Sequence, residues 1–232
     1  MIVEVQILPL LQGAKEATGL AVIIDVFRAF SLEAYMQDKG AKVIFPVQKI
    51  EDAFGLKKRY PEAILVGERN GIKVAGFDYS NSPSELIYQD LRDKIIIHTT
   101  SAGVQGLINA KKADEIVTGA LVNAKATVSY IQQKNHRHVS IVPMGWNGER
   151  MSEEDNLCAN YLLALLKGED YPSLEEEIQA LKQSEGKKFF DSTMPQFPQE
   201  DFALCTNVNY FQGVNKAIWK DNQYQMVWEK MS

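Results

Sequence analysis

Acidic and basic side chains follow directly after apolar runs at several places in this 232-residue chain. Asp25 ends the run Val22–Ile24, and Arg28 and Ser31 come within six positions of it. A hard cation binds carboxylate oxygens, and a guanidinium presents a planar fork to anionic oxygens. The segment therefore suits a metal ion beside an oxyanion, although an Asp25–Arg28 ion pair or a helix cap would account for the same residues.

Glu68 and Arg69 repeat this arrangement after the apolar run Ala63–Gly67. Alone, such a pair is typical of a surface salt bridge, which commonly contributes only about 0–1 kcal/mol. The segment continues to Asn81 and Ser82, where a proline follows that suits the first position of a helix. Backbone N–H groups at such a helix start can receive an anion, and a capped helix after a loop is the alternative interpretation.

Small hydroxyl residues form a third cluster, since Thr99, Thr100 and Ser101 follow the apolar run Ile95–Ile97. Hydroxyls and small residues let backbone amides approach a phosphate closely. The pattern differs from G-x-x-x-x-G-K-[ST], so the segment is not a P-loop. His98 lies in the same segment, and we interpret it as structural and leave it out of the catalytic set.

Glu154 and Asp155 open a helical run after the apolar segment His138–Val142. Acids at a helix start interact favourably with the helix dipole, by about 0.3–1 kcal/mol per charge. If the preceding segment is a strand of the same sheet, however, these carboxylates would gather with the earlier ones around a cation.

The elements that must position these residues are short apolar strands that alternate with helices. The predicted strands are Ile2–Leu8, Ala21–Val26, Lys42–Pro46, Ala63–Gly67, Lys94–Thr99, Glu115–Thr118 and His138–Val142. Strands that are apolar on both faces and separated by helices indicate a mostly parallel sheet layered by helices, because parallel pairing needs a crossover. The predicted fold class is therefore α/β, and ligands of such sheets bind beyond the carboxyl ends of the strands.

Helix boundaries are marked by capping residues. Ser82, Ser152 and Ser173 each stand three residues before an acid, which predicts a capping hydroxyl at a helix start. Gly40 and Gly168 follow helical runs and predict their ends. We interpret residues 1–232 as a single unit, with two intimately packed α/β halves as the alternative and no boundary visible between them.

Composition narrows the classes of partner and compartment. The net charge of -5 lacks the concentration of Lys and Arg that nucleic-acid binding needs. Apolar runs stay far below the ~20 residues of a membrane-spanning helix. The N-terminus does not resemble a secretory leader, so we predict a cytoplasmic protein. Cys158 and Cys205 are expected to be buried free thiols.

The chain resembles the 2-phosphosulfolactate phosphatase family in four segments that occur in the family's order: VIIDVFRAFS, GERNGIKVAGFDYSNSPSEL, HTTSAGVQGL and MSEEDNLCANYL. The resemblance implies Mg²⁺-dependent hydrolysis of 2-phosphosulfolactate to sulfolactate and inorganic phosphate, a step of coenzyme M biosynthesis. It also implies that the partner is a small anionic phosphorylated metabolite. Association into a homo-oligomer stays open.

On this basis we expect metal-assisted phosphoryl transfer to water. Asp25 and Glu68, with Glu154 or Asp155, would hold Mg²⁺, while Arg28 and Arg69 neutralise the substrate. The expected substrate-binding residues are Ser31, Asn81, Ser82, Thr99, Thr100 and Ser101. Three alternatives remain: an aspartyl-phosphate route in which Asp25 attacks phosphorus, a non-catalytic module that binds an acidic metabolite, and purely structural ion pairs.

Overall fold

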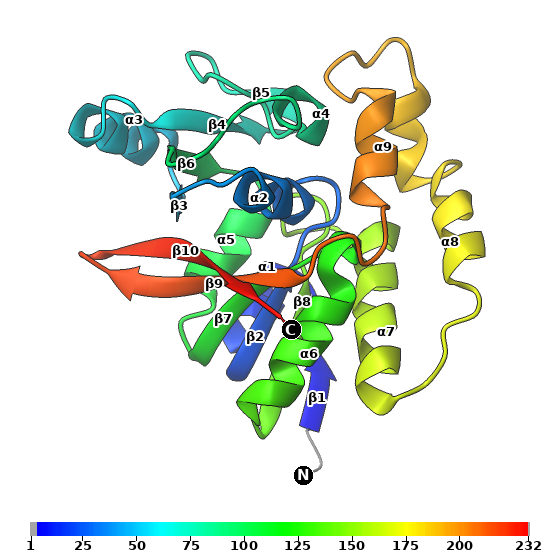
Figure 1. Cartoon of the computed structure of the whole chain (residues 1–232). Helices are drawn as coiled ribbons and strands as arrows, with labels where there is room; N and C mark the ends of the chain where they lie inside the picture. The colour runs from blue at the N-terminus through cyan, green and yellow to red at the C-terminus, as the bar shows by residue number, and fades with distance from the viewer. Residues whose placement is uncertain (1–3, 232) are drawn as a thin grey trace.

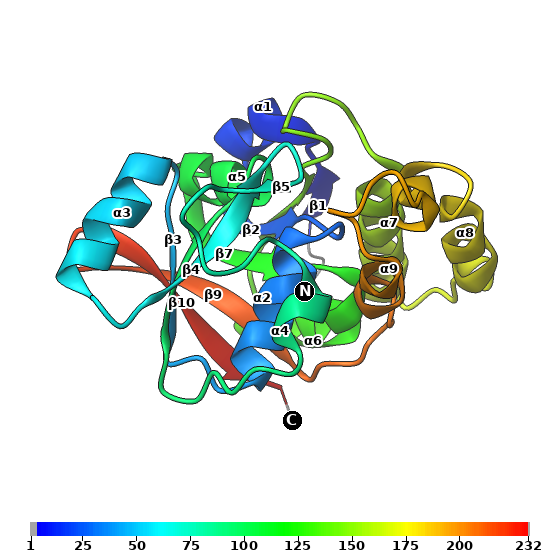
Figure 2. The same ribbon diagram turned by 90° about the horizontal axis from the view of Figure 1, so that it is seen from above.

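The computed structural model describes residues 4–231 and shows a ten-stranded sheet flanked by helices (Figures 1 and 2). The strand order is β1-β8-β2-β7-β9-β10-β3-β6-β4-β5. The strands are β1 (Glu4–Ile7), β2 (Gly19–Ile24), β3 (Val43–Pro46), β4 (Ile64–Arg69), β5 (Ile72–Lys73), β6 (Ile95–Thr99), β7 (Ala113–Gly119), β8 (His138–Pro143), β9 (Gly213–Lys220) and β10 (Gln223–Lys230).

Helices connect most of these strands. The helices are α1 (Leu10–Glu16), α2 (Ala29–Asp38), α3 (Ile50–Arg59), α4 (Pro83–Leu86), α5 (Gly103–Asn109), α6 (Ala124–Lys134), α7 (Glu153–Lys167), α8 (Leu174–Leu181) and α9 (Gln199–Cys205), with the 3₁₀ helices η1 (Leu121–Asn123) and η2 (Glu185–Phe190).

The predicted α/β class is confirmed, and each interior strand predicted from an apolar run is present. Within the described residues the first strand begins at Glu4, and Ile2 and Val3 of its predicted range lie outside them. Both predicted helix-ending glycines adopt the left-handed backbone that favours glycine, with φ +87° at Gly40 and +72° at Gly168.

Two sets of parallel strands make up most of the sheet. One set holds β1, β8, β2 and β7, and the other holds β3, β6 and β4. The antiparallel hairpin β9–β10 lies between them and pairs with β7 on one side and β3 on the other. Because three antiparallel junctions separate the sets, their strands run in opposite directions along the sheet.

Helix α2 lies between the two strand sets (Figure 1). Every residue from position 29 to 37 is buried, as expected of a helix with neighbours on all sides. Leu32 and Met36 share one hydrophobic cluster with Ile23 of β2 and with Ile44 and Ile96 of β3 and β6. The two strand sets are therefore held together through α2, and Asp25 and Arg28 stand at its amino-terminal entry.

The packing of strand β2 explains why its sequence is apolar throughout. Leu20, Val22 and Ile24 belong to the cluster that includes residues of α6 and α7, whereas Ala21 and Ile23 belong to the cluster that includes residues of α1 and α5. Both faces of this central strand are thus buried, as parallel sheets require. The first polar side chain after it, Asp25, is placed at the carboxyl edge of the sheet.

The predicted capping hydroxyls do not make capping hydrogen bonds, although helices do begin after Ser82, Ser152 and Ser173. Ser82 Oγ instead donates to Asp201, and Ser173 Oγ donates to Glu177. Ser152 Oγ has no hydrogen-bond partner within residues 4–231. The capping pattern therefore located the helix starts but not the hydroxyl partners, which tertiary contacts decide.

Two further predictions from the sequence concern membrane-spanning helices and the cysteines. Across residues 4–231, no helix has the length and apolar character required to cross a membrane. Cys158 and Cys205 are free and buried, as predicted.

Candidate active site

The carboxyl ends of β2, β4, β6 and β8 meet at a small cavity of about 40 Å³. Its lining residues are Asp25, Phe27, Arg28, Glu68, Gly71, Asn81, Ser101, Ala102, Gly145, Trp146, Asn147 and Phe197. The cavity therefore brings together five residues that the sequence predicted for the site: Asp25 and Arg28 after β2, Glu68 near the end of β4, Asn81 after β5 and Ser101 after β6. The carboxyl ends of strands are where open α/β sheets bind ligands.

Asp25 is buried at the cavity and held by backbone donors. The Gly103 N–H donates to Oδ2 at 2.9 Å, and the Ala29 N–H donates to Oδ1 at 3.3 Å. A Cβ at Gly103 would stand 2.8 Å from Asp25 Oδ2, so glycine permits this close approach. Burial, together with the smaller effect of the Glu68 carboxylate, raises the pKa of Asp25 to about 6.

Glu68 is fixed by three hydrogen bonds. Its Oε1 accepts from the Ser101 N–H at 2.6 Å, and its Oε2 accepts from the Gly71 N–H at 2.7 Å and from Ser101 Oγ at 3.0 Å. These bonds tie the end of β4 to the loop after β6. Glu68 and Asp25 thus form a pair of oriented, buried carboxylates on one cavity.

Asp155 and Glu154 are also buried, but neither is among the residues that line the cavity. Asp155 accepts from the Val26 N–H at 2.7 Å and from the Gly145 N–H at 2.8 Å, so it joins the loops after β2 and β8. Burial raises its pKa well above the usual value, helped by Glu154 and Asp25. Burial likewise raises the pKa of Glu154 to about 7.

Arg28 lines the cavity with a guanidinium that already has protein partners. Its Nη1 donates to Asp201 Oδ2 at 2.8 Å and to the Gln196 carbonyl at 3.0 Å, and its Nη2 donates to the Gly71 carbonyl at 3.3 Å. The guanidinium also lies 4.8 Å from the centroid of the Phe197 ring. A role of Arg28 in substrate binding stays a prediction, and Asp201 balances its charge within the buried pair.

Arg69 lies beside the cavity rather than among its lining residues. Its Nη1 donates to the Glu68 carbonyl at 2.6 Å, and its Nη2 donates to Thr99 Oγ1 at 2.8 Å. The remaining predicted hydroxyls also have internal partners: Ser31 Oγ donates to the Val26 carbonyl, Ser82 Oγ donates to Asp201, and Thr100 Oγ1 accepts from the Val104 N–H. Substrate contacts by these groups stay predictions.

His98 is buried between two residues of different elements. Its Nδ1 lies 3.0 Å from Glu33 Oε1, and its Nε2 lies 3.0 Å from Asn81 Oδ1. As oriented, both partners are acceptors, so both ring nitrogens donate or the Asn81 amide is turned. Because Asn81 lines the cavity, His98 positions a site residue without reaching the cavity itself.

The acids around the cavity differ from a closed metal site made by protein ligands alone. Within the described part of the chain, no group of three or more His, Cys, Asp or Glu residues is placed to hold a metal ion. Mg²⁺ usually needs only one or two carboxylates, because water and substrate phosphate complete its octahedron. Asp25 and Glu68 meet that requirement at the cavity, whereas Zn²⁺ favours nitrogen and sulfur ligands.

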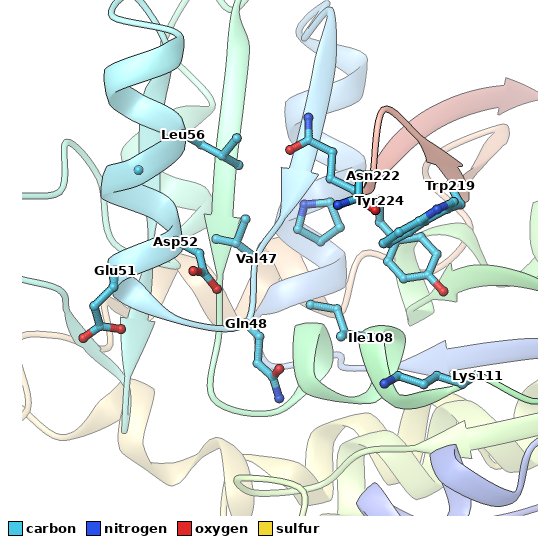
Figure 3. Close-up of a pocket in the computed structure, with 13 residues that line it drawn as sticks. Val47, Gln48, Glu51, Asp52, Leu56, Ile108, Lys111, Trp219, Asn222 and Tyr224 are labelled. Carbon is cyan, nitrogen blue, oxygen red and sulfur yellow. The ribbon is translucent and has the colours of Figure 1, made fainter.

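A second hollow, of about 720 Å³, lies between α3 and the β9–β10 hairpin (Figure 3). Trp219 and Tyr224 form one side of it, and Glu51 and Asp52 of α3 form another. None of the residues predicted for the site lines this hollow, and its two acids are exposed. The smaller cavity, with its buried carboxylates, is therefore the better candidate for catalysis.

Sequence reasoning missed the aromatic wall of the cavity. Phe27, Trp146 and Phe197 line it, and Lys188 of η2 lies over the faces of all three rings. Phe27 and Trp146 stand inside segments that the sequence had singled out, so their position was a usable signal. No local pattern marked Phe197 or Lys188, which arrive from the charged stretch after α8.

Comparison with known proteins identifies the family of this chain. A family model described as 2-phosphosulpholactate phosphatase matches residues 7–218. The chain belongs to that family. A relative from Bacillus subtilis, named probable 2-phosphosulfolactate phosphatase, is 34% identical over 80% of this chain and 81% of its own length. A relative with the same name from Thermoplasma volcanium is 30% identical over 89% of this chain and 93% of its own length. Another, from Carboxydothermus hydrogenoformans, is 42% identical over 62% of this chain and 59% of its own length.

Proposed function

We propose that this chain is a phosphoric monoester hydrolase that converts 2-phosphosulfolactate to sulfolactate and inorganic phosphate with the help of Mg²⁺. The observation that carries the proposal is the buried carboxylate pair of Asp25 and Glu68, which stand at the carboxyl ends of β2 and β4 and line one cavity. The printed names of the family and of its relatives support the substrate.

Asp25 and Glu68 would hold the metal ion at the cavity. Bound Mg²⁺ would polarise a phosphate oxygen and offset the negative charge that develops during phosphoryl transfer. The two carboxylates need no reorganisation for this role, because backbone N–H groups of Gly103, Gly71 and Ser101 already orient them. With a pKa of about 6, Asp25 is mostly ionised at pH 7 and above.

Neighbouring groups would bind and orient the phosphate. Arg28 has used three donor positions, so its Nε–H and one Nη2–H remain for an anionic oxygen. Asn81 supplies an amide at the same cavity, held by His98. Phe27 and Trp146 exclude water from one side, which strengthens electrostatic interactions inside the cavity.

The test is phosphate release from 2-phosphosulfolactate by chelator-treated protein, with Mg²⁺, Mn²⁺ or Zn²⁺ added back separately. We expect turnover that requires Mg²⁺ and that Zn²⁺ does not restore, because the ligands are hard oxygens. Full activity without a divalent ion would remove the metal from the mechanism. Tight binding of 2-phosphosulfolactate without any phosphate release would favour the non-catalytic binding module instead.

A further inference from the structure

Lys188 is not among the residues that line the cavity, but its positive charge lies against three rings that are, and it has no direct ion-pair partner within residues 4–231. Its Nζ lies 5.1 Å from the ring centroid of Trp146, 5.4 Å from Phe197, 5.6 Å from Phe189 and 5.7 Å from Phe27. Three of these four rings line the cavity. An ammonium over ring faces is attracted by their quadrupoles, so the rings hold the side chain in place.

The rings of Phe27, Trp146, Phe189 and Phe197, here called the aromatic cage, leave the hydrogen-bonding capacity of the Lys188 ammonium unused. Lys carries three N–H donors, and rings accept none of them strongly. Among residues 4–231, Lys188 Nζ makes neither a hydrogen bond nor a direct ion pair, although the side chain is half-buried. A partly desolvated cation without an acceptor is unfavourable. An anion that reaches the cage would therefore gain a strong, charge-assisted contact.

Arg28 lies over the same Phe197 ring as Lys188 but differs from it in having an ion-pair partner. Its guanidinium lies 4.8 Å from the Phe197 centroid, but the carboxylate of Asp201 pairs with it. Lys188 interacts with Glu154 at longer range: the positive charge of Lys188 lowers the pKa of Glu154, against the larger effect of burial, which raises it. Glu154 Oε2 itself lacks a hydrogen-bond partner among the described residues, so the two groups do not form a bonded pair.

We propose that Lys188 binds an acidic group of the substrate other than the phosphate. This group is the sulfonate or the carboxylate on the carbon chain of the phosphomonoester. This inference rests on the proposed function, because it assigns the phosphate to the Asp25 and Glu68 side of the cavity. The rings of Phe27, Trp146 and Phe197 then hold this second anion beside the carbon chain, and Lys188 sets a preference for phosphomonoesters that carry an acidic group besides the phosphate.

The experiment compares Lys188→Met with the matched control Lys187→Met, an exposed neighbour in the same 3₁₀ helix. Each variant is assayed with 2-phosphosulfolactate, with 2-phospholactate, which lacks the sulfonate, and with isopropyl phosphate, which lacks both further acids. For Lys188→Met we expect KM for 2-phosphosulfolactate to rise on the order of tenfold to a hundredfold, with kcat and the isopropyl phosphate reaction little changed. A matching rise with 2-phospholactate identifies the carboxylate as the bound group, and its absence identifies the sulfonate.

Equal losses on all three substrates would overturn the proposal, because Lys188 would then act on the phosphate or support the fold. No change on any substrate would overturn it as well. Calorimetric binding of sulfolactate, which has no phosphate, keeps the test independent of turnover. If the wild type hydrolyses none of the substrates, the proposed function fails, but sulfolactate binding still tests the role of Lys188. Binding that is lost in Lys188→Met and kept in Lys187→Met supports this role. Equal binding by the wild type and Lys188→Met, or no binding by the wild type, refutes it.

Discussion

Glu154 offers a direct measure of how much stability this protein gives up around its cavity. The side chain is 5% exposed, and burial raises its pKa from the usual 4.5 to about 7. Its Oε2 has no hydrogen-bond partner within residues 4–231. A Glu154→Gln substitution keeps the shape of the side chain and removes the buried charge, so we expect it to stabilise the fold at alkaline pH.

The sign and size follow from proton linkage. Because the pKa is higher in the folded chain than in the unfolded one, the wild type has the full contribution of this group below about pH 4.5 and loses it as the pH rises through about 7. The shift of the pKa corresponds to about 3 kcal/mol of unfolding free energy at pH 8.5. The variant, which cannot titrate there, should gain up to that amount at pH 8.5 and nothing at acidic pH.

Urea denaturation between about pH 4.5 and 8.5, in the presence of a chelator, measures the difference between variant and wild type. The control is Glu153→Gln, because Glu153 is exposed in the same first turn of α7. Removing that acid from a helix start should destabilise by about 0.3–1 kcal/mol at neutral pH. A Glu154→Gln variant that is less stable at pH 8.5, or whose gain does not vary with pH, would refute the reasoning.

Three further outcomes test the site. Asp25→Asn should lower kcat by at least about a hundredfold with little change in melting temperature, and near-normal kcat at saturating Mg²⁺ would exclude Asp25 from catalysis. Asp201→Ala leaves the buried Arg28 charge unpaired and should cost about 3–5 kcal/mol in urea unfolding; a loss below about 1 kcal/mol would show that the pair is not structural. Arg69→Ala should reduce kcat/KM about tenfold to a hundredfold, and an unchanged value would limit Arg69 to holding Thr99.

The parallel strands could be predicted from the sequence because both of their faces are buried. The antiparallel hairpin β9–β10 could not, since polar residues such as Asn215, Lys216 and Lys220 interrupt the apolar residues of β9. A signal was present in Asp221 and Asn222, which join the strands with φ of +53° and +63°. Positive φ at both positions is typical of a type I′ turn, although Asn-Gly and Asp-Gly are its stronger sequence marks.

The site was predictable to the extent that strand ends define it. Asp25 and Glu68 stand at the carboxyl ends of apolar strands, so the rule that ligands bind beyond those ends singled out each residue by itself. The curvature of the sheet around α2 was not predictable, and it is the reason that two strand sets of opposite direction meet at one cavity. Tertiary packing, rather than local pattern, decides that geometry.

Which of the site's charges are free to act depends on partners far away in the sequence. Arg28 has the residue type and position of a phosphate ligand, yet Asp201 neutralises it from α9, and Ser82 shares the same carboxylate. Lys188 stands in a surface-like charged stretch, yet it meets three cavity rings without an ion-pair partner among the described residues. Arg28 therefore offers the substrate N–H donors with little net charge, whereas Lys188 offers a charge that no carboxylate within residues 4–231 pairs with directly. The free charge is the one for which the fold provides aromatic faces rather than a carboxylate, because rings hold an ammonium in place without cancelling its attraction for an incoming anion.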